Sequence, residues 1–231
     1  MTTREEALTR IRRSLQTGLL PVAPLARAAA ATPEVDQVAL LDRFVREAQA
    51  NASEVFQPVT PAEVFTTLHD LIVSTDQQAI TWADEDLPVP GLREFLMQAG
   101  VTRDIPELPV DPAQRRQRWQ TLDPMRVGIT GALAGVADTG SIVVQSGRYR
   151  SRAASLLPEL HIALLPRNRL YSTMASFFAA HAAQELTTTS SNLVFITGPS
   201  RTADIEMILT HGVHGPKRLC VLLLPPFAPS A

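Results

Sequence analysis

The chain has 231 residues, of which 45% are hydrophobic and 19% are charged. This composition is that of a globular protein and excludes a disordered chain. The 21 basic and 23 acidic residues give a net charge of −2, which argues against nucleic-acid and anionic-membrane partners, since both favour a strongly basic surface.

The chain has one cysteine, Cys220, so it forms no intrachain disulfide and builds no four-thiolate metal or iron–sulfur site. Cys220 lies in the apolar run 219–224, where we expect it to pack in a buried strand. The charged N-terminus does not resemble a secretory signal. The apolar stretches are well short of the roughly 20 residues of a membrane helix. We expect a cytoplasmic protein without membrane insertion.

The N-terminal segment is predicted to be a helix from about Arg4 to Gln16, which begins with capping-box patterns and carries one apolar stripe. Residues 18–33 contain three prolines and many alanines, which is typical of a linker. We therefore expect a helix and linker over residues 1–34 and an α/β domain over residues 35–231. The arm is a candidate for exchange between subunits, and this is the one indication of a homo-oligomer.

The next part of the chain alternates helices and strands. Proline after threonine, at Thr32-Pro33 and at Thr60-Pro61, indicates an N-cap followed by a first helical residue. The apolar periodicity predicts helices over residues 33–51, 61–73, 92–98 and 112–120, and strands over residues 55–59 and 79–82.

The second half continues this alternation. Short apolar runs predict strands over residues 140–145, 160–165, 193–197 and 219–224, and the segments between them predict helices over residues 152–157, 170–184 and 202–210. Apolar strands that alternate with helices are typical of parallel sheets. The predicted fold class is α/β, with a mainly parallel sheet and helices on both faces.

Ligands of such sheets bind beyond the carboxyl ends of the strands. At residues 196–206 a predicted strand runs through Gly198 directly into a predicted helix, so backbone N–H groups would face the crevice. Gly198 would let a ligand approach the backbone, and Ser200 or Thr202 would cap the helix. Arg201 is a candidate for holding a carboxylate or phosphate, or else lies in solvent.

The same segment supplies the candidate catalytic residues, Asp204 and Glu206. Either carboxylate would accept a hydrogen bond from a ligand hydroxyl or act as a base. The alternative is an ordinary capped helix whose first-turn acids offset the helix dipole.

Other polar residues are candidates for ligand binding. Thr139, Gly140 and Ser141 form either a turn before a strand or a hydroxyl-bearing wall of the crevice. Three histidines could line the crevice, namely His161, His211 and His214. The pair at 211 and 214 lies in a glycine-rich turn without nearby carboxylates, so we predict no metal and no cofactor.

Four segments together resemble the LUD-domain family: residues 128–141, residues 155–158 with His161, residues 196–206 and residues 212–216. The resemblance implies the fold of the sugar-phosphate isomerase and coenzyme A transferase superfamily. It also implies a role in bacterial oxidation of L-lactate to pyruvate beside two iron–sulfur partner proteins. The family motif falls here on Thr139, Gly140, Gly198, Ser200, Arg201, Thr202, Asp204, Glu206, His211 and His214.

Three functions are compatible with these observations. The first is an accessory subunit without iron–sulfur clusters in a lactate-oxidising system, with a crevice for a small organic anion. The second is a stand-alone isomerase, hydrolase or transferase acting on a sugar phosphate or an acyl-coenzyme A. The third is a regulator that senses a metabolite without turnover, so whether the chain is an enzyme stays open.

Overall fold

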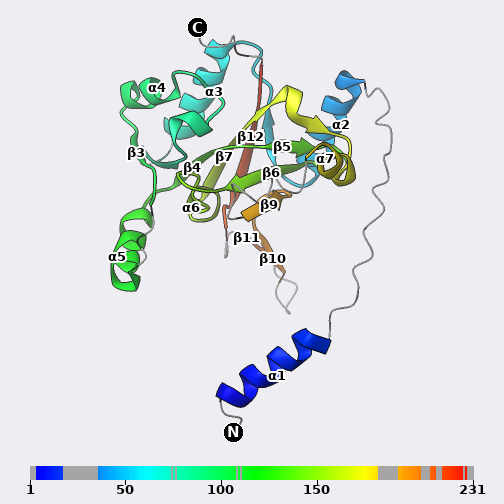
Figure 1. Ribbon diagram of the computed structural model, residues 1–231. Coiled ribbons are helices and arrows are strands. Elements are labelled where there is room, and N and C mark those ends of the chain that lie inside the picture. Colours follow the sequence, from blue (N-terminus) through cyan, green and yellow to red (C-terminus); the bar gives the residue numbers. More distant parts are fainter. Residues whose placement is uncertain are drawn as a thin grey trace. The chain divides into compact units, whose positions relative to one another are not determined.

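The structure is a computed structural model, and its elements are shown in Figure 1. It describes residues 4–17, 36–73, 75, 77–107, 109, 111–181, 192–203, 209–211, 215–225 and 227. The chain divides into two compact units, Met1–Ala31 and Thr32–Ala231. In the first unit the described element is helix α1 (Arg4–Thr17), with Glu5 and Glu6 in its first turn. The predicted division after residue 34 stays a prediction.

The second unit is built on a six-stranded sheet in which every pair of neighbouring strands is parallel. This confirms the predicted fold class. In spatial order the strands are β1 (Glu54–Phe56), β12 (Arg218–Leu224), β7 (Leu160–Pro166), β4 (Val127–Gly131), β2 (Gln78–Thr81) and β3 (Thr102–Asp104).

The helices begin at capping residues that the local sequence provides. Asp36 accepts a hydrogen bond from the backbone N–H of Val38 at the start of α2. Thr60 and Glu63 cap α3, since the Glu63 N–H donates to Thr60 Oγ1 and the Val59 N–H donates to Glu63 Oε2. The helices are α2 (Gln37–Ala50), α3 (Pro61–Val73), α4 (Leu92–Gln98), α5 (Pro112–Leu122), α6 (Ala153–Leu156) and α7 (Met174–Ala180), with 3₁₀ turns η1 (Asp84–Asp86) and η2 (Arg167–Arg169).

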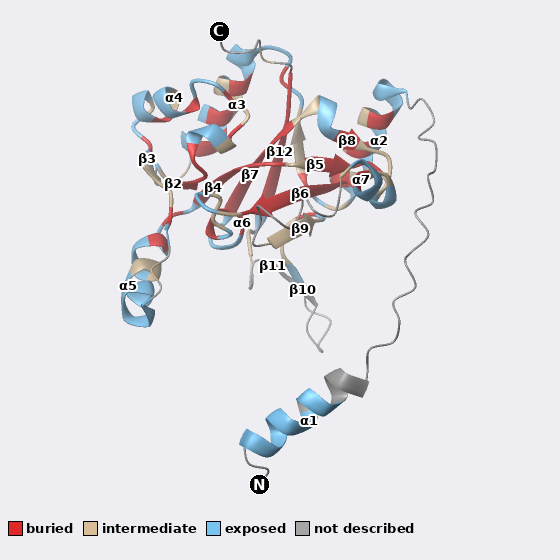
Figure 2. Cartoon of the chain, viewed as in Figure 1, coloured by how far each residue is buried: buried red, intermediate tan, exposed pale blue. Residues whose placement is uncertain are grey.

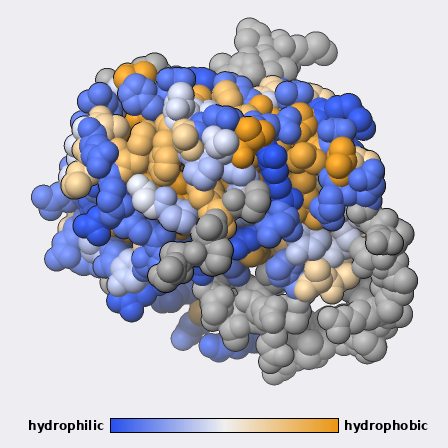
Figure 3. All heavy atoms as spheres, turned by 90° about the horizontal axis from the view of Figure 1, so that it is seen from above, coloured by the Kyte–Doolittle hydropathy of each residue, from blue (hydrophilic) through white to orange (hydrophobic). Residues whose placement is uncertain are grey.

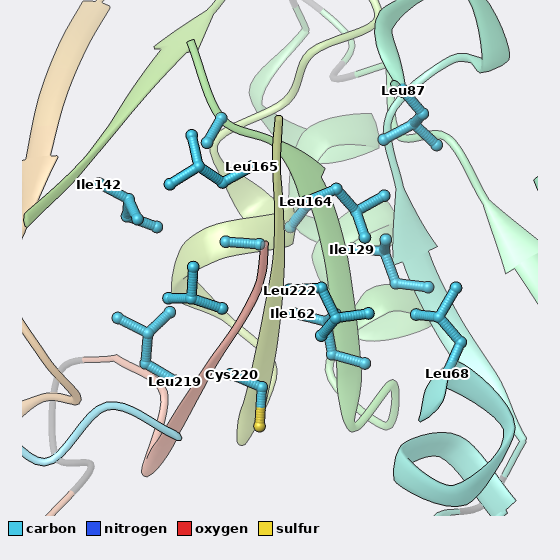
Figure 4. Close-up of a cluster of buried hydrophobic side chains, with 14 of the residues drawn as sticks. Leu68, Leu87, Ile129, Ile142, Ile162, Leu164, Leu165, Leu219, Cys220 and Leu222 are labelled. Carbon is cyan, nitrogen blue, oxygen red and sulfur yellow. The ribbon is translucent and has the colours of Figure 1, made fainter. Parts of the chain in front are cut away.

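The core lies on both faces of the sheet, and the central strands are buried almost throughout (Figure 2). Cys220, Ile162 and Ile129 are in register on three neighbouring strands and so share one face, which Leu68 of α3 covers (Figure 4). The Cys220 thiol is fully buried, as predicted, and burial raises its pKa to about 12. It is therefore a packing residue rather than a nucleophile.

The opposite face is covered by α6 and by a second sheet. A Cβ atom at Gly128 of β4 would lie 1.7 Å from the carbonyl oxygen of Ala154, so only glycine lets α6 pack this closely. At Gly135 of β5, a Cβ atom would lie within 3 Å of Leu165 and Phe44. The second sheet has the order β8 (Leu170–Tyr171), β5 (Ala134–Val136), β6 (Ser141–Ser146), β9 (Asn192–Ile196).

Two predicted helices are wrong in part. The helix expected over residues 170–184 is preceded by strand β8 and begins only at Met174, where Thr173 and Ser176 form a capping box. The helix expected over residues 202–210 is replaced at both ends by strands β10 (Arg201–Ala203) and β11 (Leu209–His211), which pair antiparallel. Strand pairing thus overrides the helical periodicity of this segment.

The strand order places a topological switch point between β2 and β4. From β2 the chain moves outward to β3, and it then returns past β2 and continues through β4, β7 and β12 in the other direction. Loops that leave two neighbouring strands in opposite directions open a crevice at their carboxyl ends, where open α/β sheets bind ligands.

The described part of the chain contains no helix long and apolar enough to cross a membrane. On the face shown in Figure 3, hydrophobic residues lie in groups separated by hydrophilic ones.

Candidate functional site

A cavity of about 210 Å³ lies at the switch point, and we call it the switch-point crevice. One wall follows β2 and contains Trp82, Glu85 and Asp86. Another follows β4, from Gly131 to Leu133. Its remaining polar residues are Gln145 of β6, Arg150 from the loop after β6 and Arg169 from the 3₁₀ turn after β7.

Short-range packing fixes the acidic turn 84–86 over the end of β4. A Cβ atom at Gly131 would lie 2.7 Å from the Asp86 carbonyl oxygen, so glycine permits this approach. Arg103 of β3 donates to Thr81 Oγ1 at 3.0 Å and pairs with Asp84 at 2.7 Å. The turn is thereby tied to both neighbouring strands.

The charged groups of the crevice are incompletely paired. Arg150 Nε lies 3.6 Å from Asp86 Oδ1, which is too long for a hydrogen bond, and this Nε is buried without a hydrogen-bond partner. Burial raises the pKa of the Asp86 carboxyl and outweighs the lowering by Arg150, while Glu85 adds to the rise. Among the described residues, no carboxylate lies within ion-pair distance of Arg169.

This arrangement suits a small anion with a second polar group. Guanidinium groups bind carboxylates through charge-assisted, often bidentate hydrogen bonds. Asp86 can accept a hydrogen bond from a ligand hydroxyl when it is ionised, or donate one when it is protonated. In the described part of the chain, no group of three or more His, Cys, Asp or Glu residues is arranged to hold a metal ion.

Several predicted site residues gather elsewhere, in a chain of hydroxyls. Thr139 Oγ1 lies 2.8 Å from Ser141 Oγ, which lies 2.7 Å from Thr197 Oγ1. Beside them, Asp138 Oδ1 is buried without a hydrogen-bond partner. The structure therefore brings Thr139 and Ser141 together, but neither lines the switch-point crevice.

The end of helix α2 packs directly against the two glycines predicted for the site, Gly140 and Gly198. Gly140 and Gly198 have φ values of +63° and +83°. A Cβ atom would lie 2.1 Å from the Ala48 nitrogen at Gly140 and 2.1 Å from the Asn51 carbonyl oxygen at Gly198. The Asn51 amide also donates to the Thr139 carbonyl at 3.2 Å. Both glycines thus let two turns dock against one helix end.

His161 lies in the core. Its side chain is 1% exposed, and its Nε2 lies 2.8 Å from Thr130 Oγ1 on the neighbouring strand. Burial lowers its pKa to about 4, so the ring is neutral at pH 7. In this position it has no surface for a ligand.

The remaining predicted residues belong to the segment 200–214, of which the structure describes residues 200–203 and 209–211. Arg201 is exposed, and the Ser200 N–H donates to the Pro216 carbonyl at 2.9 Å. For Thr202 and His211 only the backbone is described, and Asp204, Glu206 and His214 lie outside the described residues. Because a strand rather than a helix follows Ser200, the expected helix N-terminus does not form there. The roles of these side chains stay predictions.

Asp86, Arg150 and Arg169 line the crevice but are not among the residues predicted from the sequence. Asp86 could have been predicted from the sequence, because residues 84–86 follow a predicted strand and so lie at the carboxyl edge of the sheet. No local pattern identifies Arg150 and Arg169, because the fold alone brings their loops to β2 and β4.

Comparisons with known proteins agree with the fold. The model of the LUD domain family matches residues 41–224. Lactate utilization protein C of Halalkalibacterium halodurans is 33% identical over 153 residues, which are 64% of this chain and 63% of that protein. The protein of the same name from Shouchella clausii is 31% identical, over 73% of this chain and 72% of its own. A crystal structure of a DUF162 family protein from Deinococcus radiodurans superposes with a TM-score of 0.57 at 23% identity, covering 82% of this chain and 98% of that one.

Proposed function

Because the chain belongs to the LUD domain family, we propose that it serves in lactate utilization by binding a small hydroxy- or oxo-carboxylate in the switch-point crevice. The names of its relatives support the pathway. The geometry of the crevice supports the ligand class.

The observation that carries this proposal is the buried Arg150 Nε without a hydrogen-bond partner. Beside it in the same crevice lies the exposed Arg169, which pairs with no carboxylate among the described residues. A ligand carboxylate between them would satisfy the buried Arg150 Nε. The volume of about 210 Å³ holds only about seven water-sized groups at roughly 30 Å³ each. A three-carbon acid such as L-lactate or pyruvate fits this volume.

Asp86 supports a preference for hydroxy acids. With the carboxylate on the arginines, the 2-hydroxyl of lactate would donate to the Asp86 carboxylate, which among the described residues forms an ion pair with Arg150 alone. Hydrogen bonds of this charge-assisted kind contribute about 1.5–3 kcal/mol each. Asp86 and the arginines would thus hold the 2-carbon in one orientation.

We further propose that the chain is the subunit without iron–sulfur clusters in a lactate-oxidising system. Conversion of lactate to pyruvate releases two electrons and two protons, so it needs an electron acceptor. The one cysteine, Cys220, is buried and cannot supply a four-thiolate cluster. Iron–sulfur partner proteins would take the electrons, while this chain would bind the acid.

The test is growth on L-lactate as sole carbon source, in a deletion strain that lacks other lactate-oxidising enzymes. We expect no growth without this protein and rescue by the wild type. Arg169→Gln should fail to rescue, because it removes a carboxylate-binding charge, whereas Arg46→Gln, at an exposed position of α2, should rescue fully. Growth of the deletion strain, or rescue by Arg169→Gln, would contradict the proposal.

A further inference from the structure

We propose that a second and larger cavity beside the crevice binds a mononucleotide-type ligand, in which phosphates are joined to a flat aromatic ring. This cavity of about 710 Å³ lies between the loop 147–152, helix α6 and the segment of Trp119 on α5. It shares Arg150 with the switch-point crevice. The inference does not rest on the proposed role in lactate utilization.

The loop 147–152 is held in one conformation. Gly147 and Arg150 exchange two backbone hydrogen bonds of 3.2 Å, and Tyr149 between them has a φ of +59°. The loop is anchored from outside by Trp82 Nε1, which donates to the Ser151 carbonyl, and by the Ala83 N–H, which donates to the Tyr149 carbonyl. A non-glycine residue in this region is strained, and such strain concentrates at ligand sites.

The fixed loop presents three arginines to the cavity, at positions 148, 150 and 152. Among the described residues, no carboxylate lies within ion-pair distance of Arg148 or Arg152. Glu107 is the one acidic residue that lines the cavity in the described part of the chain. The cavity is therefore positive on a chain whose net charge is −2. Arginine groups of this kind bind phosphate oxygens through paired N–H donors.

Other residues that line the cavity are apolar or aromatic. Leu156 and Leu157 are 41% and 40% exposed, and Trp119 is half-buried. Arg118, next to Trp119, pairs with Asp104 of β3 and so fixes α5 to the sheet. Arg148 lies 4.8 Å above the Tyr149 ring. Rings and exposed leucines beside cations fit the flat base of a nucleotide.

The size and shape of the cavity favour a small molecule over a macromolecule. Its volume lies within the roughly 300–1,000 Å³ of ligand sites in proteins. The nearly balanced charge of the chain argues against a nucleic acid as the ligand. The ligand class that combines several negative oxygens with one aromatic ring is that of the nucleoside phosphates.

The test is calorimetric titration of the purified full chain with ADP, adenosine and pyrophosphate. ADP should bind at least about ten-fold more tightly than either fragment, because the fragments contact only the apolar residues or only the arginines. The double variant Arg148→Gln/Arg152→Gln should weaken ADP binding at least about ten-fold. The matched control, Arg43→Gln/Arg46→Gln at two exposed positions of α2, should leave ADP binding unchanged.

Two further variants locate the ligand. Trp119→Leu should weaken ADP and leave pyrophosphate unaffected, while Arg169→Gln, which lines only the crevice, should leave ADP binding unchanged even if it abolishes lactate use. Circular dichroism checks that each variant is folded. Absence of ADP binding at millimolar concentration, equal binding by the Arg148/Arg152 variant, or binding of poly-glutamate in place of ADP would overturn the inference.

Discussion

At the residue scale, His161 couples the stability of the fold to pH. Its ring is buried and neutral, with a pKa of about 4 against an ordinary value of 6.5. Between these two values the unfolded chain binds more protons than the folded one, so stability falls as the pH falls through this window. Above pH 6.5 the contribution of His161 to the free energy of unfolding no longer changes with pH.

We predict that this histidine alone costs the protein about 3 kcal/mol of unfolding free energy between pH 6.5 and pH 4, at about 1.4 kcal/mol per pH unit. Urea unfolding of wild type and His161→Gln at both pH values measures the loss. The variant should be less stable at pH 7 but lose less on acidification. His69→Gln, on the exposed side of α3, should follow the wild type, and a similar loss in all three proteins would refute the assignment.

At the element scale, the end of α2 is held by two glycine turns. Gly140→Ala would drive a Cβ atom to 2.1 Å from the Ala48 nitrogen. Overpacking of this kind typically costs about 1–3 kcal/mol, in addition to about 1–2 kcal/mol for a left-handed non-glycine residue. We expect Gly140→Ala to lower the free energy of unfolding by the sum of these two costs.

Gly100→Ala is the matched control for this substitution. Gly100 has a φ of +73°, but its nearest neighbour would be a flexible side-chain atom of Gln77 at 3.8 Å. It should therefore show the conformational cost without the clash. In chemical unfolding, the free energy of unfolding of Gly140→Ala should be lower than that of Gly100→Ala by at least about 1 kcal/mol. Equal free energies of unfolding would mean that α2 does not pack against Gly140.

Elements with strong local signals were predictable from the sequence. The helices α3 and α4 match their predicted bounds, because threonine and glutamate cap the first and glycine ends the second. The three-residue strands β3 and β5 are too short to show a periodicity. The β10–β11 hairpin was predicted as a helix because its apolar spacing is helical, while its pairing depends on the tertiary fold.

The candidate site was less predictable than the fold. The rule that ligands bind at the carboxyl ends of strands predicts the edge of the sheet, but the strand order decides which strand ends lie next to each other. The position of β2 between β3 and β4 cannot be read from local spacing. Arg150 and Arg169 come from loops after β6 and β7, so only the folded chain brings them to Asp86.

At the scale of the whole molecule, the proposed function depends on the switch point between β2 and β4. The parallel sheet directs its strand ends to one edge, the reversal of strand order opens the crevice, and loops from both sheets supply its charges. Function is thus expected to concentrate at one edge of the sheet, whereas the glycine-rich motif residues at 140 and 198 stabilise the docking of α2.

Calorimetric titration of the purified chain with L-lactate at pH 7 tests the proposed lactate site most directly. We predict binding that Arg169→Gln weakens about 10- to 100-fold, as expected for the loss of a charged hydrogen bond worth about 1.5–3 kcal/mol. Propionate, which lacks the hydroxyl, should bind more weakly than lactate. Arg46→Gln should bind lactate like the wild type. Absence of lactate binding, or equal affinity in wild type and Arg169→Gln, would contradict the proposed lactate site.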